Sequence, residues 1–239
     1  MNFNKVISKF WKNLPWLFYL PWSVFFNFKH LPFKQACHLP IWLYKPRFGK
    51  LSGKIIISGN VYFGMIKLGS KECFVYPGRG ISVENRGVIE FCGRCFIGSD
   101  SYISVASTGY LKIGDNFISF AACTLICHYK ITLDDNVMVG WESKIMDTDF
   151  HRLSVEQGDR PTGYGEVRIG SGCWLGFGSV VLAGVSIPPF CVVSARSIVK
   201  KKLQCLPKTL LAGFPAKPVK QGVWLNRNDM NISFEERNA

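Results

Sequence analysis

The sequence predicts an all-β fold, a parallel β-helix of hexapeptide repeats. A six-residue period supports this fold, whereas a long break in the period indicates a surface loop and an N-terminal segment of different composition indicates an appendage. Branched aliphatic residues recur every six positions at Ile169, Leu175, Val181, Ile187, Val193 and Val199. Four positions after each of the first five stands a small residue: Cys173, Ser179, Val185, Cys191 and Ser197. Such hexapeptide periods are typical of a parallel β-helix. Both sets should point inward, and like residues should stack at ~4.8 Å.

Residues 1–50 are the first element, a short helical appendage that is basic and aromatic. Eleven Lys and Arg, and no acidic residue, precede Glu72 in a chain of net charge +13. The apolar stretch 14–28 contains Pro15 and Pro21 and is too short for a transmembrane helix of about 20 residues. Two interpretations stay open. The segment could lie on an anionic membrane surface, or it could pack against the β-helix or a neighbouring subunit.

Residues 51–206 are the second element, the β-helix itself. Earlier repeats begin at Phe91, Ile97 and Ile103, and their fifth residues are Cys95, Ser101 and Ser107. The period resumes two residues out of phase at Leu133, which predicts a longer corner near 128–130. Residues 147–166 lack the period, so we expect a surface loop that carries the active site. Pro207 ends the repeats, and residues 207–239 form a C-terminal tail.

Nine cysteines and a basic charge raise the question of metal, disulfides or nucleic acid. Four of the cysteines occupy fifth positions, where a thiol is a small apolar filler: Cys95, Cys123, Cys173 and Cys191. Cys92 and Cys95 form a lone CxxC without further ligands at zinc spacing, so we expect no metal. The cations are mixed with apolar residues, so we expect no nucleic-acid partner. Free thiols without a secretory signal pattern indicate a cytoplasmic protein.

Three segments occur in an order that resembles a known family: the hexads, DTDFH at 147–151, and AGFPAKPVK at 212–220. The sequence resembles the hexapeptide-repeat acyltransferases with a left-handed β-helix, and among them the sugar O-acetyltransferases. The resemblance covers roughly residues 90–220. It implies an acetyl-CoA-dependent transfer to a sugar hydroxyl, with a role in surface polysaccharide biosynthesis. It also implies a homotrimer whose active sites lie between neighbouring prisms.

The candidate catalytic residues follow from the chemistry and from this resemblance. Acyl transfer to an alcohol needs a base, and an imidazole titrates near pH ~6.5. Two of the four His lie in the repeat region, His128 and His151, and His151 in DTDFH matches the family's catalytic His. Asp147 and Asp149 either orient the imidazole or only solvate a turn. His128 is a weaker candidate for a role beside the acceptor.

The resemblance also implies a set of residues that bind acetyl-CoA. Trp174, Gly176 and Phe177 match the family's segment along the pantetheine arm, as does Ala195. A glycine there would let the arm approach the backbone. The basic residues that align with the family's phosphate-binding positions are Lys200, Lys201, Lys217 and Lys220. Lysine supplies a point charge for phosphate, although most lysine runs are only solvated.

The sequence also departs from the family and leaves alternatives. The asparagine that the sugar acetyltransferases have before the catalytic coil aligns near Phe120, in the segment ISFAAC, so the acceptor pocket should differ. An N-acyltransferase of amino sugars uses the same scaffold, but residues 1–50 cannot form the nucleotide-binding domain that such enzymes often carry. A γ-class carbonic anhydrase needs three His ligands, and only His128 and His151 are available. A structural β-helix without activity is the non-enzymatic alternative.

Overall fold

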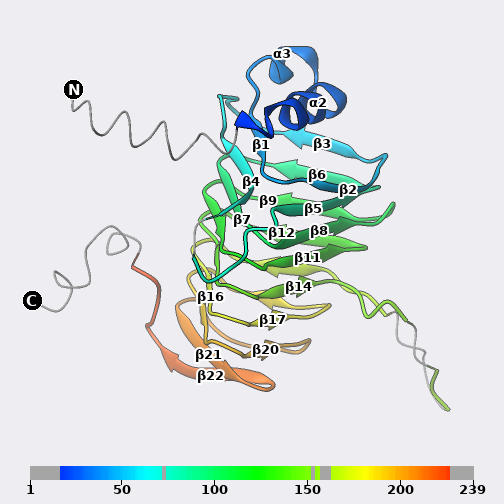
Figure 1. Cartoon of the computed structure of the whole chain (residues 1–239). Helices are drawn as coiled ribbons and strands as arrows, with labels where there is room; N and C mark the ends of the chain where they lie inside the picture. The colour runs from blue at the N-terminus through cyan, green and yellow to red at the C-terminus, as the bar shows by residue number, and fades with distance from the viewer. Residues whose placement is uncertain (1–16, 72–73, 152–153, 157–162, 227–239) are drawn as a thin grey trace, which may run out of the picture.

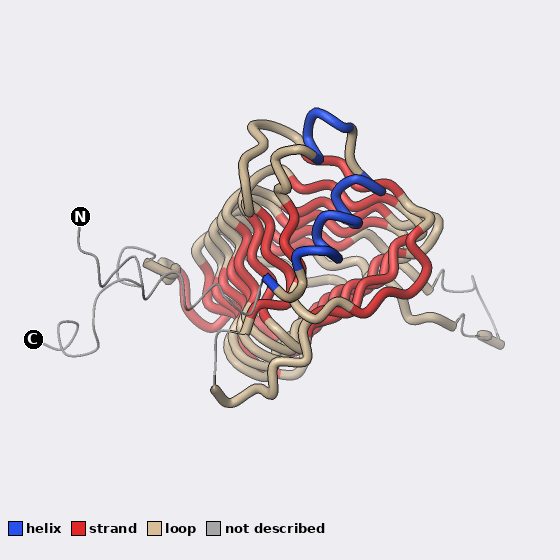
Figure 2. Tube along the Cα trace, turned by 45° about the horizontal axis from the view of Figure 1, so that its top comes forward, coloured by secondary structure: helices blue, strands red, loops and turns tan. Residues whose placement is uncertain are grey.

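The chain folds into a prism of stacked coils with three sheet faces, in a computed structural model that describes residues 17–71, 74–151, 154–156 and 163–226 (Figures 1 and 2). Sheet A has nine strands: β1 (Ile41–Leu43), β4 (Ile66–Ser70), β7 (Cys95–Gly98), β10 (Phe117–Ser119), β13 (Met138–Val139), β16 (Trp174–Leu175), β19 (Val192–Val193), β21 (Thr209–Gly213) and β22 (Ala216–Gln221). Sheet B has seven: β2 (Arg47–Leu51), β5 (Ile81–Asn85), β8 (Ser101–Val105), β11 (Thr124–Cys127), β14 (Lys144–Met146), β17 (Val180–Val181) and β20 (Ile198–Val199). Sheet C has six: β3 (Lys54–Ile57), β6 (Val88–Phe91), β9 (Tyr110–Ile113), β12 (Lys130–Leu133), β15 (Val167–Ile169) and β18 (Ser186–Ile187).

Each of the first six coils takes one strand from each sheet, the seventh has only β19 and β20, and adjacent coils pair in parallel. The only antiparallel strand pair in the described chain is β21 with β22, a hairpin that closes sheet A. We call the turns from sheet A to sheet B the A–B corner (99–100, 120–123, 140–143, 176–179 and 194–197). The turns from sheet B to sheet C are the B–C corner (86–87, 106–109, 128–129, 147–166 and 182–185). The predicted parallel β-helix is therefore confirmed.

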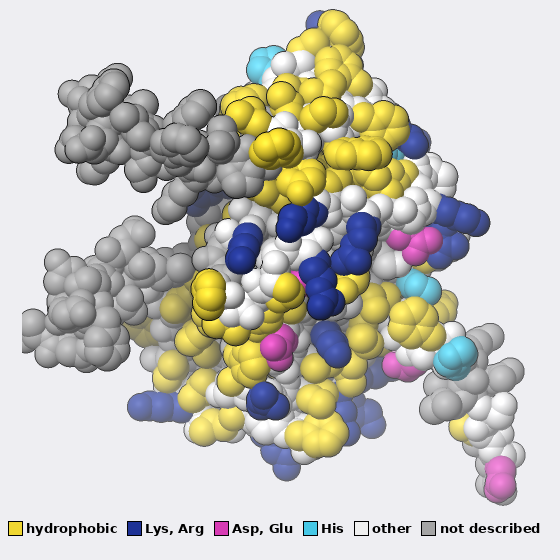
Figure 3. All heavy atoms as spheres, viewed as in Figure 1, with side chains coloured by type: hydrophobic (Ala, Val, Ile, Leu, Met, Phe, Trp, Pro, Cys, Tyr) yellow, Lys and Arg dark blue, Asp and Glu magenta, His cyan; other side chains and the backbone are white. Residues whose placement is uncertain are grey.

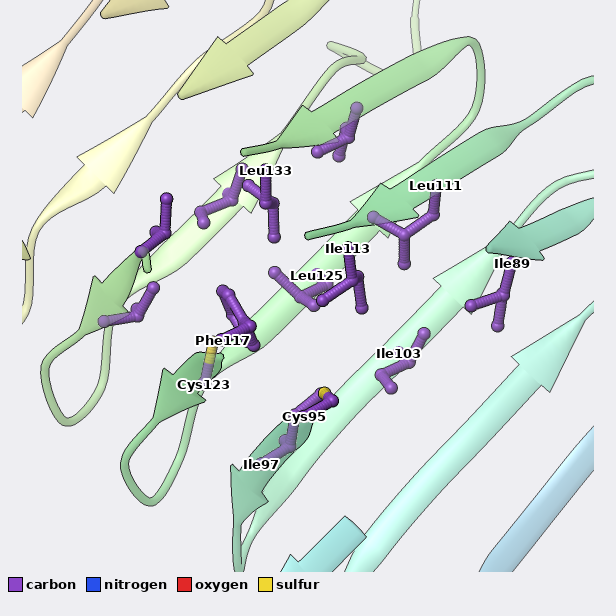
Figure 4. Packing of buried hydrophobic residues seen from close by; sticks show 14 of the residues in the cluster. Ile89, Cys95, Ile97, Ile103, Leu111, Ile113, Phe117, Cys123, Leu125 and Leu133 are labelled. Carbon is purple, nitrogen blue, oxygen red and sulfur yellow. The ribbon is translucent and has the colours of Figure 1, made fainter. Parts of the chain in front are cut away.

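Residues of the same type lie above one another in columns along the axis of the prism. In sheet B the inward column runs through Val83, Ile103, Leu125, Ile145, Val181 and Val199. Figure 4 shows such side chains meeting between the sheets. All six lead residues from Ile169 to Val199 are buried, as are the five small residues that follow them. Burial raises the pKa of the Cys123 thiol to about 12, which suits an inert filler.

Three details differ from the expected pattern. Ser107 is exposed, because the five-residue strand β8 shifts the corner by a few positions. The phase change near 128–130 comes from longer strands, since β11 and β12 have four residues each and their counterparts β17 and β18 have two. Strand β1 already belongs to the first coil, so the sheets begin upstream of residue 51.

Helix α2 (Leu20–His30) caps the open end of the prism, followed by the short helix α3 (Phe33–Ala36). The Asn27 side chain donates to the Ile41 carbonyl (2.7 Å) and accepts from the Ile41 amide (3.1 Å). The Ser23 hydroxyl accepts from the Leu43 amide (3.0 Å). Phe26 is buried among them. This face of α2 thus supplies hydrogen-bond partners for the edge of β1. Backbone groups left unpaired at such an edge could pair with a strand of another chain.

The opposite face of this cap is exposed and aromatic. Phe18 and Phe33 are 79% and 73% exposed, and about half of the Trp22 side chain is accessible. Figure 3 shows hydrophobic side chains gathered at this end, with Lys and Arg on the band below them. None of the helices in the described residues is long and apolar enough to cross a membrane. Residues 1–16 of the predicted appendage lie outside the described residues.

Candidate active site

The loop 147–166 leaves the prism at the B–C corner, between β14 and β15. Its base is held by an isolated antiparallel bridge and two flanking backbone hydrogen bonds. The Asp149 amide donates to the Gly163 carbonyl (2.8 Å), and the Gly165 amide donates to the Asp147 carbonyl (3.0 Å). A bridge between Thr148 and Tyr164 lies between these bonds. Residues 152–153 and 157–162 of the loop lie outside the described residues.

Asp147 is fully buried and holds the neighbouring coil. Its carboxylate accepts hydrogen bonds from the backbone amides of His128 (2.7 Å) and Tyr129 (2.8 Å). Both oxygens therefore serve the turn between β11 and β12. A buried carboxylate needs such donors to offset its desolvation. Of the two roles considered for Asp147, these bonds favour the structural one.

His151 stands exposed at the base of this loop, and its amide donates to the Asp149 carbonyl (2.7 Å). Asp149 is exposed as well. The His151 imidazole makes no hydrogen bond to another described residue. Next to it in sequence, the Phe150 ring lies edge-on to the His128 ring, with centroids 5.1 Å apart. The structure thus brings His128 beside the His151 loop and leaves the His151 imidazole accessible.

Four of the predicted acetyl-CoA residues share one cavity on the outside of sheet A. Trp174, Gly176, Phe177 and Ala195 line a space of about 520 Å³ that also includes Trp141. Its other lining residues are Phe120, Met138, Gly140, Val192, Val193, Ser194 and Leu210. The cavity is mostly apolar, as is common for small-molecule sites. We call it the sheet A cavity.

The sequence suggested that Gly176 is a glycine so that the pantetheine arm can approach the backbone. The structure shows another cause, which is the contact between adjacent coils. A Cβ built on Gly176 would lie 2.7 Å from the Ala195 amide nitrogen of the next coil. Close packing of the coils therefore excludes any side chain at this position. Gly176 is needed to form the wall of the cavity, whether or not a ligand approaches it.

Arg196 and Trp141 are two residues of this region that the sequence did not single out. The Arg196 guanidinium lies over the Phe177 ring, 5.2 Å from its centroid. The rings of Trp141 and Phe120 are 5.0 Å apart. Arg196 could have been identified from the sequence, because it directly follows the predicted acetyl-CoA residue Ala195 in the same turn. Trp141 carries no such signal, since its neighbours come from other coils.

The predicted phosphate-binding lysines fall into two groups. Lys217 and Lys220 are exposed on β22, and Lys220 pairs with Leu210, which lines the sheet A cavity. Lys200 and Lys201 follow β20 at the far end of sheet B, and the Lys201 side chain lies over Gly184 of the B–C corner. Within one chain, the two groups therefore lie on different sides of the prism. No cluster of His, Cys, Asp and Glu in the described residues could hold a metal ion.

Comparison with known proteins supports the same fold. No family model matches the chain. It is 32% identical over 112 residues to a Schizosaccharomyces pombe protein that is named as an acetyltransferase, covering 46% of this chain and 53% of that protein. It is 28% identical over 136 residues to the galactoside O-acetyltransferase of Escherichia coli, covering 56% of this chain and 63% of that enzyme.

The chain is similar to hexapeptide-repeat sugar O-acetyltransferases. The matched region spans about half of the first relative and less than two thirds of the second. Among solved structures, the polySia-specific acetyltransferase NeuO superposes with a TM-score of 0.55 at 18% identity, over 79% of this chain and 75% of that one. The predicted left-handed β-helix is confirmed by this likeness.

Proposed function

We propose that this protein is an acetyl-CoA-dependent O-acetyltransferase that acts on a sugar hydroxyl in surface polysaccharide biosynthesis. The observation that carries the proposal is the sheet A cavity, which gathers Trp174, Gly176, Phe177 and Ala195. The family resemblance implies these four as acetyl-CoA residues, without regard to any contact between them. Lys220 pairs with Leu210, which lines the cavity, and Lys217 lies on the same strand, so both would supply cations for the phosphate groups. Lys200 and Lys201 would contribute from the other side of the prism.

In the proposed reaction His151 acts as the general base. The imidazole takes the proton of the sugar hydroxyl as the oxygen attacks the thioester carbonyl. The carbon–sulfur bond then breaks, and the imidazolium returns the proton to the departing CoA thiolate. The products are an acetylated sugar and free CoA. Asp149 would orient His151, whereas Asp147 would hold the turn that positions the loop.

The site would be completed by a second copy of the chain, in a homotrimer. The sheet A cavity and the His151 loop lie at different corners of one prism. The outward residues of sheet A form an almost continuous apolar ladder: Trp42, Phe96, Ile118, Met138, Trp174, Val192 and Leu210. Sheet C carries charges such as Lys112 and Arg168 at the matching positions. An apolar face of this kind favours contact with another subunit.

We further propose that the cytoplasmic enzyme touches the inner face of an anionic membrane through the exposed aromatic face of the helical cap, which includes Phe18, Trp22 of α2 and Phe33 of α3. Exposed rings combined with cations suit the lipid interface. In vesicle sedimentation at low salt, the full chain should pellet with anionic lipid, and a Phe18→Ser/Phe33→Ser variant should not. A truncated chain starting at residue 51 would lack β1 and most of β2, so point variants are the better test. The control is Phe214→Ser at the opposite end, where the ring is 78% exposed.

The central test is thiol release from acetyl-CoA with a panel of oligosaccharides. We expect release with at least one sugar, and acetyl on a hydroxyl of the product by mass spectrometry. An amino-sugar arm tests the N-acyltransferase alternative, since amide formation would replace ester formation. A folded protein that neither binds acetyl-CoA nor releases thiol with any sugar would contradict the proposal and favour a structural β-helix.

A further inference from the structure

A second cavity, of about 490 Å³, opens at the A–B corner next to the sheet A cavity. We call it the corner pocket. Phe177 lines both cavities, so they share a wall. The other residues around it are Asp100, Tyr102, Ala122, Thr124, Glu142, Lys144, Gly178, Val180 and Arg196. In contrast to the apolar sheet A cavity, the corner pocket contains two carboxylates, two cations and two hydroxyl groups.

The corner pocket arises from a column of turn residues that stack on one another. Asp100, Ala122, Glu142, Gly178 and Arg196 all have φ between 57° and 63°, and each stands at the same point of its coil. Charged side chains alternate along this column with Ala122 and Gly178. The small residues leave notches between the charged ones. The floor of the pocket is the outward column of sheet B, where Tyr102, Thr124, Lys144 and Val180 are in register.

The segment 74–80 reaches down from the second coil and fixes both carboxylates of the corner pocket. Asp100 accepts hydrogen bonds from the amides of Gly78 (3.0 Å) and Arg79 (3.2 Å). The Tyr76 hydroxyl donates to Glu142 (3.0 Å), 66 positions away in the sequence. The acidic groups are therefore engaged by the protein itself.

The two cations of the corner pocket, Lys144 and Arg196, differ from its carboxylates in their contacts with the protein. In the described part of the chain, neither Lys144 nor Arg196 forms an ion pair with a carboxylate. Lys144 is exposed on the pocket floor, and Arg196 lies over the Phe177 ring. The corner pocket thus offers a ligand two cations without an ion-pair partner among the described residues, whereas its two carboxylates already accept hydrogen bonds from the protein. The Tyr102 ring, 46% exposed, offers an apolar face beside it.

We propose that the corner pocket binds the acceptor as a sugar ring that bears an anionic group, and that Lys144 selects for that group. This inference rests on the proposed function, because transfer requires an acceptor beside the donor, and Phe177 joins the two cavities. A ring stacks on Tyr102, its hydroxyls meet Thr124 and Glu142, and its anion meets Lys144. The anion could be a ring carboxylate or a phosphate ester, which share this chemistry.

The experiment compares three probes in acetyl transfer: a galacturonic acid oligosaccharide, the neutral galactose oligosaccharide of equal length, and galactose 1-phosphate. The wild type should prefer one of the anionic probes over the neutral one by roughly tenfold or more in kcat/KM, since a charge-assisted contact is worth about 1.5–3 kcal/mol. Lys144→Gln should raise the KM for the anionic probe and remove the preference, with the KM for acetyl-CoA unchanged. The matched control, Lys112→Gln on sheet C, should retain it.

The outcomes separate the carboxylate from the phosphate source and this inference from the proposed function. A preference for galacturonate assigns the carboxylate, and a preference for galactose 1-phosphate assigns the phosphate. Equal use of neutral and anionic probes would overturn the inference, as would a Lys144→Gln effect on acetyl-CoA alone. If no probe is acetylated, saturation-transfer NMR on the full chain still decides it. Binding of an anionic probe that Lys144→Gln abolishes would uphold the pocket while the acetyltransferase proposal fails.

Discussion

At both the A–B and the B–C corner, an aspartate accepts hydrogen bonds from two successive amides of a neighbouring segment: Asp100 from Gly78 and Arg79, and Asp147 from His128 and Tyr129. This hydrogen-bonded aspartate has a different structural role at each corner. At the A–B corner it holds a segment over the corner pocket, next to the sheet A cavity. At the B–C corner it anchors the base of the loop that carries His151. The proposed binding surfaces and the candidate base thus occupy separate corners of one prism.

The largest expected effect tests the B–C corner. His151→Ala should lower kcat by about 10²–10⁴-fold, because a general base is lost, while acetyl-CoA binding stays intact. Steady-state kinetics measures the loss of kcat, and calorimetry measures acetyl-CoA binding separately. His128→Ala serves as the neighbouring control and should cost much less. Activity of His151→Ala within a factor of three of the wild type would remove His151 from the mechanism.

Mixing two inactive variants tests whether the corners belong to different copies. Trp174→Ala damages the sheet A cavity, and His151→Ala removes the base. Co-refolded at equal amounts, random trimers should regain activity at about one quarter of their sites, because each site takes its cavity and its base from different chains. Activity per trimer after size-exclusion chromatography measures this. No recovery in mixed trimers would place the whole site within one chain.

The two aspartates allow a direct comparison of stability. Asp147→Ala leaves the His128 and Tyr129 amides without their acceptor, a fully buried carboxylate, and should lower the free energy of unfolding by about 2–4 kcal/mol. Asp100→Ala should cost less, because water can reach the Gly78 and Arg79 amides more easily. Urea denaturation measures both. If Asp147→Ala instead kept full stability and lost only activity, Asp147 would orient the base rather than hold the turn.

The smallest effect concerns Lys217 on β22, the strand that pairs with β21 beside the sheet A cavity. Lys217→Ala should raise the KM for acetyl-CoA by roughly tenfold with little change in kcat, because a contact to a remote phosphate binds ground and transition states alike. The wild type should distinguish acetyl-CoA from acetyl-dephospho-CoA, and the variant should not. A variant that discriminates as well as the wild type would refute the assignment to the terminal phosphate.

The six-residue period by itself determined the β-helix and its core. Residues such as Ile169 and Cys173 had to point inward, because a regular coil repeats the same orientation at the same step. The motif DTDFH likewise located His151 at the break in the period. These inferences depend only on neighbours in the sequence. These inferences can therefore be made without knowing which coils are in contact.

Only the tertiary structure decided what the outward side chains meet. Tyr76 reaches Glu142, the Asn27 side chain bonds to Ile41, and the Asp147 carboxylate accepts from the amides of the turn at 128–129. The extra residues of β8, β11 and β12 change the register between coils, so partners cannot be counted from a fixed repeat. The period fixes a side chain's direction. Its contacts depend on stacking across whole coils and on excursions that have no period.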